Sequence, residues 1–314
     1  MKRNHALLAA LLLLPLLLGA QAPANDYTQY VNPFIGTQTD ETGALSGSTF
    51  PGATMPQGMV QLSPETEQMV TWDPCSGYDY NKDVIYGFTH THLSGTGCTD
   101  LIDVSLMPMI QRPTPDRLKA GDFGQHYSHD TESARPGYYQ VLLTEKRANV
   151  EFKVNVELSA TVRTGIHRYT FRKGDPQFVV LDLDRGPFRG EAYYSKRRTY
   201  DVIQSQIRVV DDHTIEGYRI VTGWAKLRKV YFRAEFSKPI KEHLLMTGDL
   251  NVGKSDVVNG RNLRAAFRFG QEGGKELMVK VAISPVDIEG ARKNMAAEAP
   301  SWNFDDYVQA AHDA

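Results

Sequence analysis

Apolar and polar residues alternate along several stretches of the chain. The clearest stretch runs from Val150 to Leu158, where every second side chain is apolar and those between are charged or polar. A period of two buries one face of a strand and leaves the other in solvent. The alternation recurs over 230–236 and 277–283, and 178–183 is a short continuous apolar run. We therefore expect many strands, each with at least one buried face.

Turns rich in Gly, Pro and Asp separate these stretches. Lys173-Gly174-Asp175-Pro176 marks one turn and Gly273-Gly274 another. Short strands separated by such turns are typical of stacked antiparallel sheets, so we expect a mostly β fold. The segment 112–137 contains three prolines and no strong period. We expect it to be a long surface loop.

A helical period replaces the alternation after Pro285. Apolar residues from Ile288 to Met295 predict one helix that ends near Pro300, and Ser301 or Asn303 can cap a second. The second helix carries an apolar stripe: Phe304, Tyr307, Val308 and Ala311. Because the sequence stops at its end, we expect an exposed apolar patch around this stripe and Trp302, and a chain that is a fragment. The alternative is a helix that docks back onto the sheets.

The N-terminus has the pattern of a secretory signal peptide. Lys2 and Arg3 precede an apolar run that small residues follow, and we expect cleavage after Ala24. A membrane anchor is the alternative, but the run is shorter than the roughly 20 residues that span a bilayer. We therefore expect residues 1–24 to be removed and the chain to be exported, periplasmic or extracellular, with no membrane part.

Composition excludes one class of partner. The formal net charge is −2, so no basic field is present to hold nucleic acid. Export also bears on the two cysteines, Cys75 and Cys98, because an oxidising compartment favours a disulfide between them. Two free buried thiols are the alternative. Zinc is not expected, since there is no CxxC pair.

The stretch from Trp72 to Asp100 carries the best candidate chemistry. An indole can stack on the apolar face of a pyranose, and the carboxylate of Asp73 can accept from vicinal hydroxyls. Trp72 lies in a turn-rich segment rather than in an alternating strand, which favours a sugar contact over a core role. Trp224 precedes a strand and could equally fill the core.

His90 and His92 stand two residues apart, so on an extended segment they point the same way and could share a metal. No third ligand follows from spacing, and hydrogen bonding to a ligand or to the backbone is the stronger interpretation. Ser94-Gly95-Thr96-Gly97 supplies hydroxyls and flexible backbone for a close-fitting loop. Four acidic residues lie in or beside the stretch, and spacing marks none as a catalytic acid: Asp73, Asp79, Asp100 and Asp103.

Several motifs in order resemble one family. They are Tyr30-Val-Asn-Pro-Phe-Ile-Gly36, Phe50-Pro-Gly-Ala-Thr-Met-Pro-Gln-Gly-Met-Val-Gln-Leu-Ser63, Cys75-Ser-Gly-Tyr78, Gly87-Phe-Thr-His-Thr-His-Leu-Ser-Gly-Thr-Gly97, Gly217-Tyr-Arg219 and Gly223-Trp-Ala225. Together they resemble the N-terminal domain of glycoside hydrolase family 92, the exo-acting α-mannosidases. The resemblance continues to Ala291-Arg-Lys293 and so covers nearly all of the mature chain.

The resemblance implies a β-supersandwich over 25–284, then linker helices over 285–314 that lead into an (α/α)6 barrel. It also implies a mannoside pocket between sandwich and barrel, a calcium ion, and an acid and base that invert the anomeric centre. The barrel supplies that pair and most of the metal site, so no catalytic or calcium-binding residue is assigned in this chain. The residues expected to contribute to substrate binding are Trp72, Asp73, Tyr78, His90, His92 and Ser94.

Two hypotheses follow. In the first, the chain is the N-terminal sugar-pocket domain of an exported, calcium-dependent α-mannosidase. That enzyme would act on mannose-rich N-glycans, with α-1,2 links expected, and the fragment alone would be inactive. In the second, the chain is a self-standing carbohydrate-binding β-sandwich without catalysis.

Overall fold

The computed structural model describes residues 26–40, 47–68, 75–97, 99–147, 150–187, 200–253, 255–272 and 274–314. The predicted signal peptide lies outside these residues. The chain divides into a short unit that ends at Val31 and a compact unit from Asn32 to Ala314. The described part of the first unit contains one 3-10 turn, η1 (Thr28–Tyr30). No helix among the described residues is long and apolar enough to cross a membrane.

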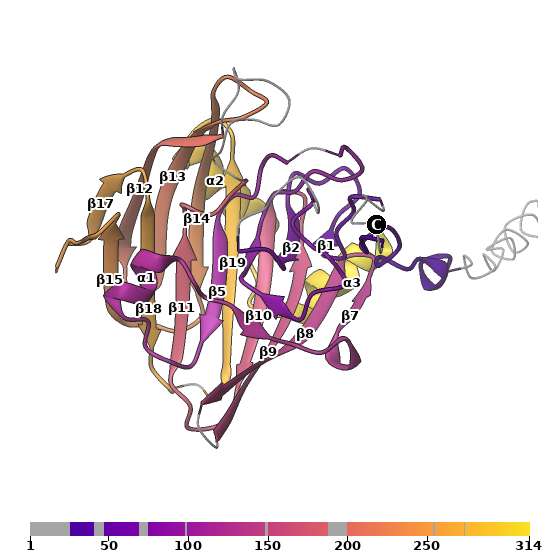
Figure 1. The fold of residues 1–314 in the computed structure, drawn as a ribbon, viewed down its shortest axis with the longest axis horizontal. Helices are drawn as coiled ribbons and strands as arrows, with labels where there is room; N and C mark the ends of the chain where they lie inside the picture. The colour runs from indigo at the N-terminus through magenta and orange to yellow at the C-terminus, as the bar shows by residue number, and fades with distance from the viewer. Residues whose placement is uncertain are drawn as a thin grey trace, which may run out of the picture. The chain divides into compact units, whose positions relative to one another are not determined.

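Two antiparallel sheets form a sandwich in the larger unit, which confirms the predicted fold class (Figure 1). The first sheet has the described strands in the order β1 (Ala53–Thr54), β2 (Gln61–Glu65), β4 (Gly87–Thr89), β5 (Ser105–Met109), β11 (Gln177–Asp182), β18 (Leu263–Phe269), β15 (Ile240–Thr247) and β16 (Leu250–Asn251). The second has the order β17 (Val257–Gly260), β12 (Asp201–Asp211), β13 (Thr214–Thr222), β14 (Arg228–Phe236), β19 (Glu276–Ser284), β10 (Thr164–Phe171), β9 (Val150–Ala160), β8 (Tyr138–Arg147), β6 (Gln125–His126) and β3 (Val84–Ile85), and β7 (Ser133–Arg135) also pairs with β8.

The predicted alternation appears as one-sided burial. In β14, Val230, Phe232, Ala234 and Phe236 are buried, and the residues between them are partly exposed. In β19, by contrast, nearly every side chain is buried, because this central strand faces the other sheet on one side and a helix on the other. The continuous apolar run in β11 is likewise buried along its whole length.

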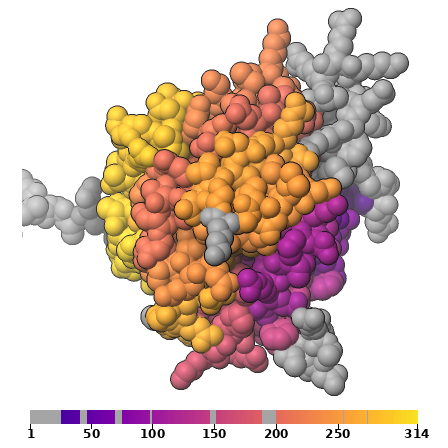
Figure 2. Space-filling view, turned by 90° about the vertical axis from the view of Figure 1, so that its left-hand side faces the viewer, coloured from indigo at the N-terminus to yellow at the C-terminus, as the bar shows by residue number. Residues whose placement is uncertain are grey.

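The main hydrophobic core lies between the sheets and includes residues of both. A second, smaller core lies on the outer face of the second sheet, under α2 (Ile288–Glu298) and α3 (Phe304–Asp313). The helix α1 (Pro115–Ala120) contacts β18 and β15 of the first sheet. Figure 2 shows the yellow C-terminal helices and the magenta region of α1 on opposite sides of the orange strands.

The predicted exposed patch at the C-terminus is wrong. Phe304 is 2% exposed, and Tyr307 and Ala311 are also buried, because the apolar face of α3 packs against β9 and β10. Trp302 remains 41% exposed, with Lys280 Nζ 4.0 Å from its ring centroid. The helix therefore docks back onto the sheet, which was the alternative, and its stripe carries no argument about the length of the protein.

The segment 112–137 is more ordered than the expected surface loop. It contains α1, β6, β7 and a 3-10 turn, η2 (His129–Thr131). Leu118, Phe123 and Tyr127 from this segment are buried in the main core. Thr114 caps α1 by accepting from Arg117 N, and Gly121 ends it in a left-handed conformation. Its apolar residues are too widely spaced to produce a recognisable period.

Candidate functional site

Part of the predicted sugar-binding stretch lies outside the described residues: Trp72, Asp73 and Cys98. The described part begins at Cys75, which is buried, whereas its predicted partner Cys98 lies outside the described residues. The disulfide to Cys98 therefore stays a prediction. The remainder, residues 75–97, passes through β3 and β4 and ends in an exposed loop at Ser94 to Thr96.

A buried carboxylate that the sequence analysis missed organises this stretch. Glu65, at the end of β2, has no exposed surface, and its Oε1 accepts from Thr89 Oγ1 and His92 Nε2, both at 2.5 Å. Gly77 lies against the other oxygen with φ near +91°, and a Cβ there would be 2.1 Å from Glu65 Oε2. The Cys-Ser-Gly-Tyr motif therefore needs glycine at this position, for both its conformation and its close approach.

The two histidines bond to different partners within the chain. His90 Nδ1 bonds to Val104 O at 2.6 Å, and its Nε2 lies 3.1 Å from His167 Nε2. His92 instead bonds to Gln61 O and Glu65. Both rings are buried and have partners within the chain. Their internal hydrogen bonds hold the segment in place. Contact of either histidine with a sugar stays a prediction.

Tyr78 also lies beneath the surface. Its hydroxyl donates to the carboxylate of Glu132 at 2.9 Å, and the hydroxyl of Tyr139 donates to the same group at 2.6 Å. Burial, followed by the charge of Glu132, raises the pKa of Tyr78 far above its usual value. Tyr78 therefore stays a neutral donor. Among the described residues expected to bind substrate, only Ser94 is exposed.

The acidic candidates are held by the chain itself. Asp103 has no exposed surface and lies between Arg219 and Arg228. Burial opposes its ionisation, but Arg228 and Arg219 outweigh burial and lower its pKa. Asp79 accepts from Thr39 Oγ1 at 2.8 Å and from Asn81 N at 3.0 Å. These partners mark both carboxylates as structural.

Asp100 joins the stretch to the loop between β13 and β14. Its Oδ2 accepts from the backbone N–H of Trp224 at 2.9 Å. Trp224 itself is 54% exposed, so it does not fill the core. The backbone between Asp100 and β5 is strained, since Leu101, Ile102 and Val104 all have positive φ. This conformation is uncommon for residues other than glycine and rarest for β-branched ones such as Ile102 and Val104.

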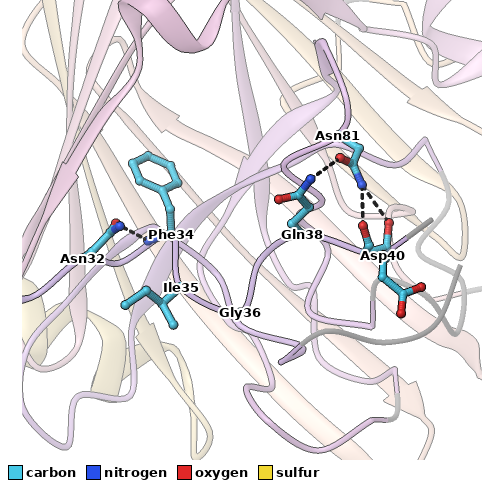
Figure 3. A pocket seen from close by; sticks show the side chains of 8 residues that line it. Asn32, Phe34, Ile35, Gly36, Gln38, Asp40 and Asn81 are labelled. Carbon is cyan, nitrogen blue, oxygen red and sulfur yellow. Dashed lines mark hydrogen bonds between the residues drawn. The ribbon is translucent and has the colours of Figure 1, made fainter. Parts of the chain in front are cut away.

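A hollow of about 780 Å³ lies where the Asn-Pro-Phe-Ile-Gly motif meets Asn81. Its lining residues are Asn32, Phe34, Ile35, Gly36, Gln38, Thr39, Asp40 and Asn81. Figure 3 shows Gln38 and Asn81 joined by a hydrogen bond on one side and Phe34 and Ile35 on the other. Amide groups beside apolar surface are compatible with a polyhydroxylated ligand.

The described residues contain no group of three His, Cys, Asp or Glu side chains that could hold a metal ion. The charged side chains near the predicted pocket pair with one another instead, as Asp103 does with Arg219.

Comparisons with known proteins agree with the motifs. The profile of the family described as "Glycosyl hydrolase family 92 N-terminal domain" matches residues 30–284. The GH92 α-mannosidase BT3965 from Bacteroides thetaiotaomicron is 34% identical, with a TM-score of 0.76 over 92% of this chain and 37% of that chain. The GH92 glycosyl hydrolase ccman5 is 26% identical, with a TM-score of 0.75 over 92% and 36%.

A curated relative from Arthroderma benhamiae is described as an uncharacterized secreted glycosidase. It is 28% identical over 168 residues, which are 50% of this chain and 20% of the relative. The chain thus spans less than two fifths of the length of each of these relatives. Because the family profile covers most of the chain, this protein belongs to glycosyl hydrolase family 92 through its N-terminal domain.

Proposed function

We propose that this chain is the N-terminal, sugar-binding part of an exported α-mannosidase. The enzyme removes mannose from mannose-rich N-glycans, cleaves α-1,2 links and inverts the anomeric centre. The observation that carries the proposal is the family match over residues 30–284. A structure of the relative BT3965 in complex with mannoimidazole adds support, since the match to it covers 92% of this chain.

The proposed pocket is formed by the stretch that begins at Trp72. Trp72 stacks on the pyranose and Asp73 accepts from its hydroxyls. Ser94 contributes from the exposed loop. His90, His92 and Tyr78 act below the surface by holding that stretch in place, which their burial and internal hydrogen bonds support.

Catalysis in this proposal is completed by parts of the family enzymes outside this chain. We place the acid, the base and the calcium ligands there. Export follows from the signal-like residues 1–24, and the secreted relative supports it. The enzyme would then act in the periplasm or outside the cell.

The role of Trp72 can be tested in the whole enzyme proposed here, expressed from its complete gene. Trp72→Ala should lower kcat/KM on α-1,2-mannobiose about ten-fold, because losing one aromatic contact costs on the order of 1.4 kcal/mol. The melting temperature should stay unchanged. Trp302→Ala, on the opposite side of the second sheet from the main core, should leave kcat/KM unaltered. A large loss of stability in Trp72→Ala with normal kcat/KM would assign Trp72 to the core.

A further inference from the structure

A second cavity lies at the end of β11, apart from the hollow around Asn81. Its volume is about 300 Å³, near the lower end of ligand pockets, which span roughly 300–1,000 Å³. The turn after β11, strand β18 and the end of α1 form its walls. The lining residues are Gln68, Ala120, Gly121, Asp182, Asp184, Arg185, Gly186, Pro187 and Arg264.

Arg185 is the unusual member of this set. It is 5% exposed, and its Nη2 donates to the carbonyl oxygen of Glu67, while its Nε has no hydrogen-bond partner. Within the described part of the chain it forms no ion pair, although the buried Arg219 and the partly buried Arg228 and Arg264 each do. A buried guanidinium with unused donors is costly unless another group supplies acceptors.

The other charges in the cavity balance one another. Arg264 donates to Asp182 Oδ2 at 3.0 Å and to Asp184 Oδ2 at 2.7 Å. With Arg185 included, the described lining residues carry two cations and two anions. A cavity without excess positive charge does not favour a free anion. Guanidinium donors beside carboxylate and amide acceptors suit a neutral polyol, whose hydroxyls both donate and accept.

We propose that this cavity binds one hexose unit of a glycan, with Arg185 donating its fork of N–H groups to vicinal hydroxyls. Gln68 at the rim adds an amide, and it precedes Trp72 and Asp73 in the chain. The inference rests on the proposed function, because it takes the ligand to be a glycan.

The test is a calorimetric titration of this chain with α-1,2-mannobiose, and separately with inorganic phosphate. The wild-type chain should bind the disaccharide and not phosphate. Arg185→Lys keeps the charge but loses the planar fork, and should weaken binding about ten-fold or more. Gln68→Leu, on the exposed rim, should weaken binding without affecting the fold. Arg112→Met, an exposed arginine of another surface, is the matched control and should bind like the wild type.

The outcomes separate the two proposals. Wild-type binding with unchanged affinity in Arg185→Lys and Gln68→Leu would overturn the subsite and leave the proposed function standing. Failure of the wild type to bind the disaccharide at all would count against the proposed function as well. Phosphate binding that Arg185→Lys weakens would show an anion site instead and overturn the inference. A circular-dichroism melting curve for each variant confirms that it is folded.

Discussion

At the scale of single residues, a chain of neutral hydrogen bonds joins the candidate site to the second sheet. Val104 O can only accept, so His90 Nδ1 donates and its Nε2 accepts from His167 Nε2. His167 Nδ1 then accepts from the hydroxyl of Tyr169 at 2.9 Å. Every member has a partner only while both imidazoles are neutral. These hydrogen bonds connect strand β10 with the segment that follows β4.

This pair predicts how stability depends on pH. Burial lowers the pKa of His90 to about 4 and that of His167 well below its usual value, whereas unfolded histidine titrates near pH 6.5. The unfolded chain therefore binds protons first as the pH falls below about 6.5, and the free energy of unfolding decreases down to about pH 4. Urea unfolding across this range measures the slope. His167→Gln should reduce the slope of the free energy of unfolding against pH, whereas His126→Gln, at an exposed position, should leave it unchanged. Equal slopes in the wild type and both variants would contradict the account.

Glu65 carries the second residue-level prediction. Glu65→Gln keeps the shape but removes the charge that accepts from Thr89 and His92. Leaving a buried donor without its acceptor costs about 1–3 kcal/mol, so we expect a loss of at least that size in the free energy of unfolding, measured in urea. Glu272→Gln removes one partner of an exposed ion pair with Lys241 and should cause no measurable change. Equal stabilities of the two variants would show that Glu65 does not organise the site.

At the scale of elements, ion pairs and apolar packing together fix α2 and α3 on the outer face of the second sheet. Glu216 of β13 accepts from Arg208, Arg233 and, from α2, Arg292. Burial opposes ionisation of Glu216, but the hydrogen bonds from these arginines outweigh it and lower its pKa to about 2. Lys280 of β19 donates to Ala299 O just beyond the end of α2.

Phe304 tests whether this docking stabilises the fold. Phe304→Ala empties a buried position of the second core and should lower the free energy of unfolding by about 3–5 kcal/mol. Val286→Ala, at an exposed apolar position before α2, should change it by less than about 0.5 kcal/mol. Chemical denaturation of both variants gives the comparison. A value for Phe304→Ala as small as that for Val286→Ala would mean that α3 contributes little.

The hydrophobic pattern was enough to predict β9, β11, β14, β19 and both C-terminal helices, because burial on one face or on both leaves a local signal. It was not enough to predict what covers α3, since an apolar stripe does not identify its partner. Pairings between distant segments, such as β5 with β11 and β11 with β18, also leave no local signal. The short elements of 112–137 were missed because their apolar residues are too widely spaced to show a period.

At the scale of the whole molecule, the location of the sugar site stays a prediction, and the groups that support the predicted stretch were not predicted. The motifs identified the family and the stretch after Trp72. Four side chains from other elements hold this stretch and the residues just after it. They are Glu65 of β2, His167 of β10, Arg219 of β13 and Glu132, which follows η2 directly. Nothing in their local sequence marks Glu65 or Glu132 as partners of residues far along the chain. Their buried positions follow only from the packing of the sheets.

The most direct test of the proposed function is the configuration of the released sugar. The protein expressed from its own gene is incubated with α-1,2-mannobiose and calcium, and the anomeric proton signals of mannose are followed by NMR from the first minutes. Inversion places the attacking water on the face opposite the leaving group, so β-mannose should appear first and then equilibrate. Initial release of α-mannose, or no release at all, would contradict the account.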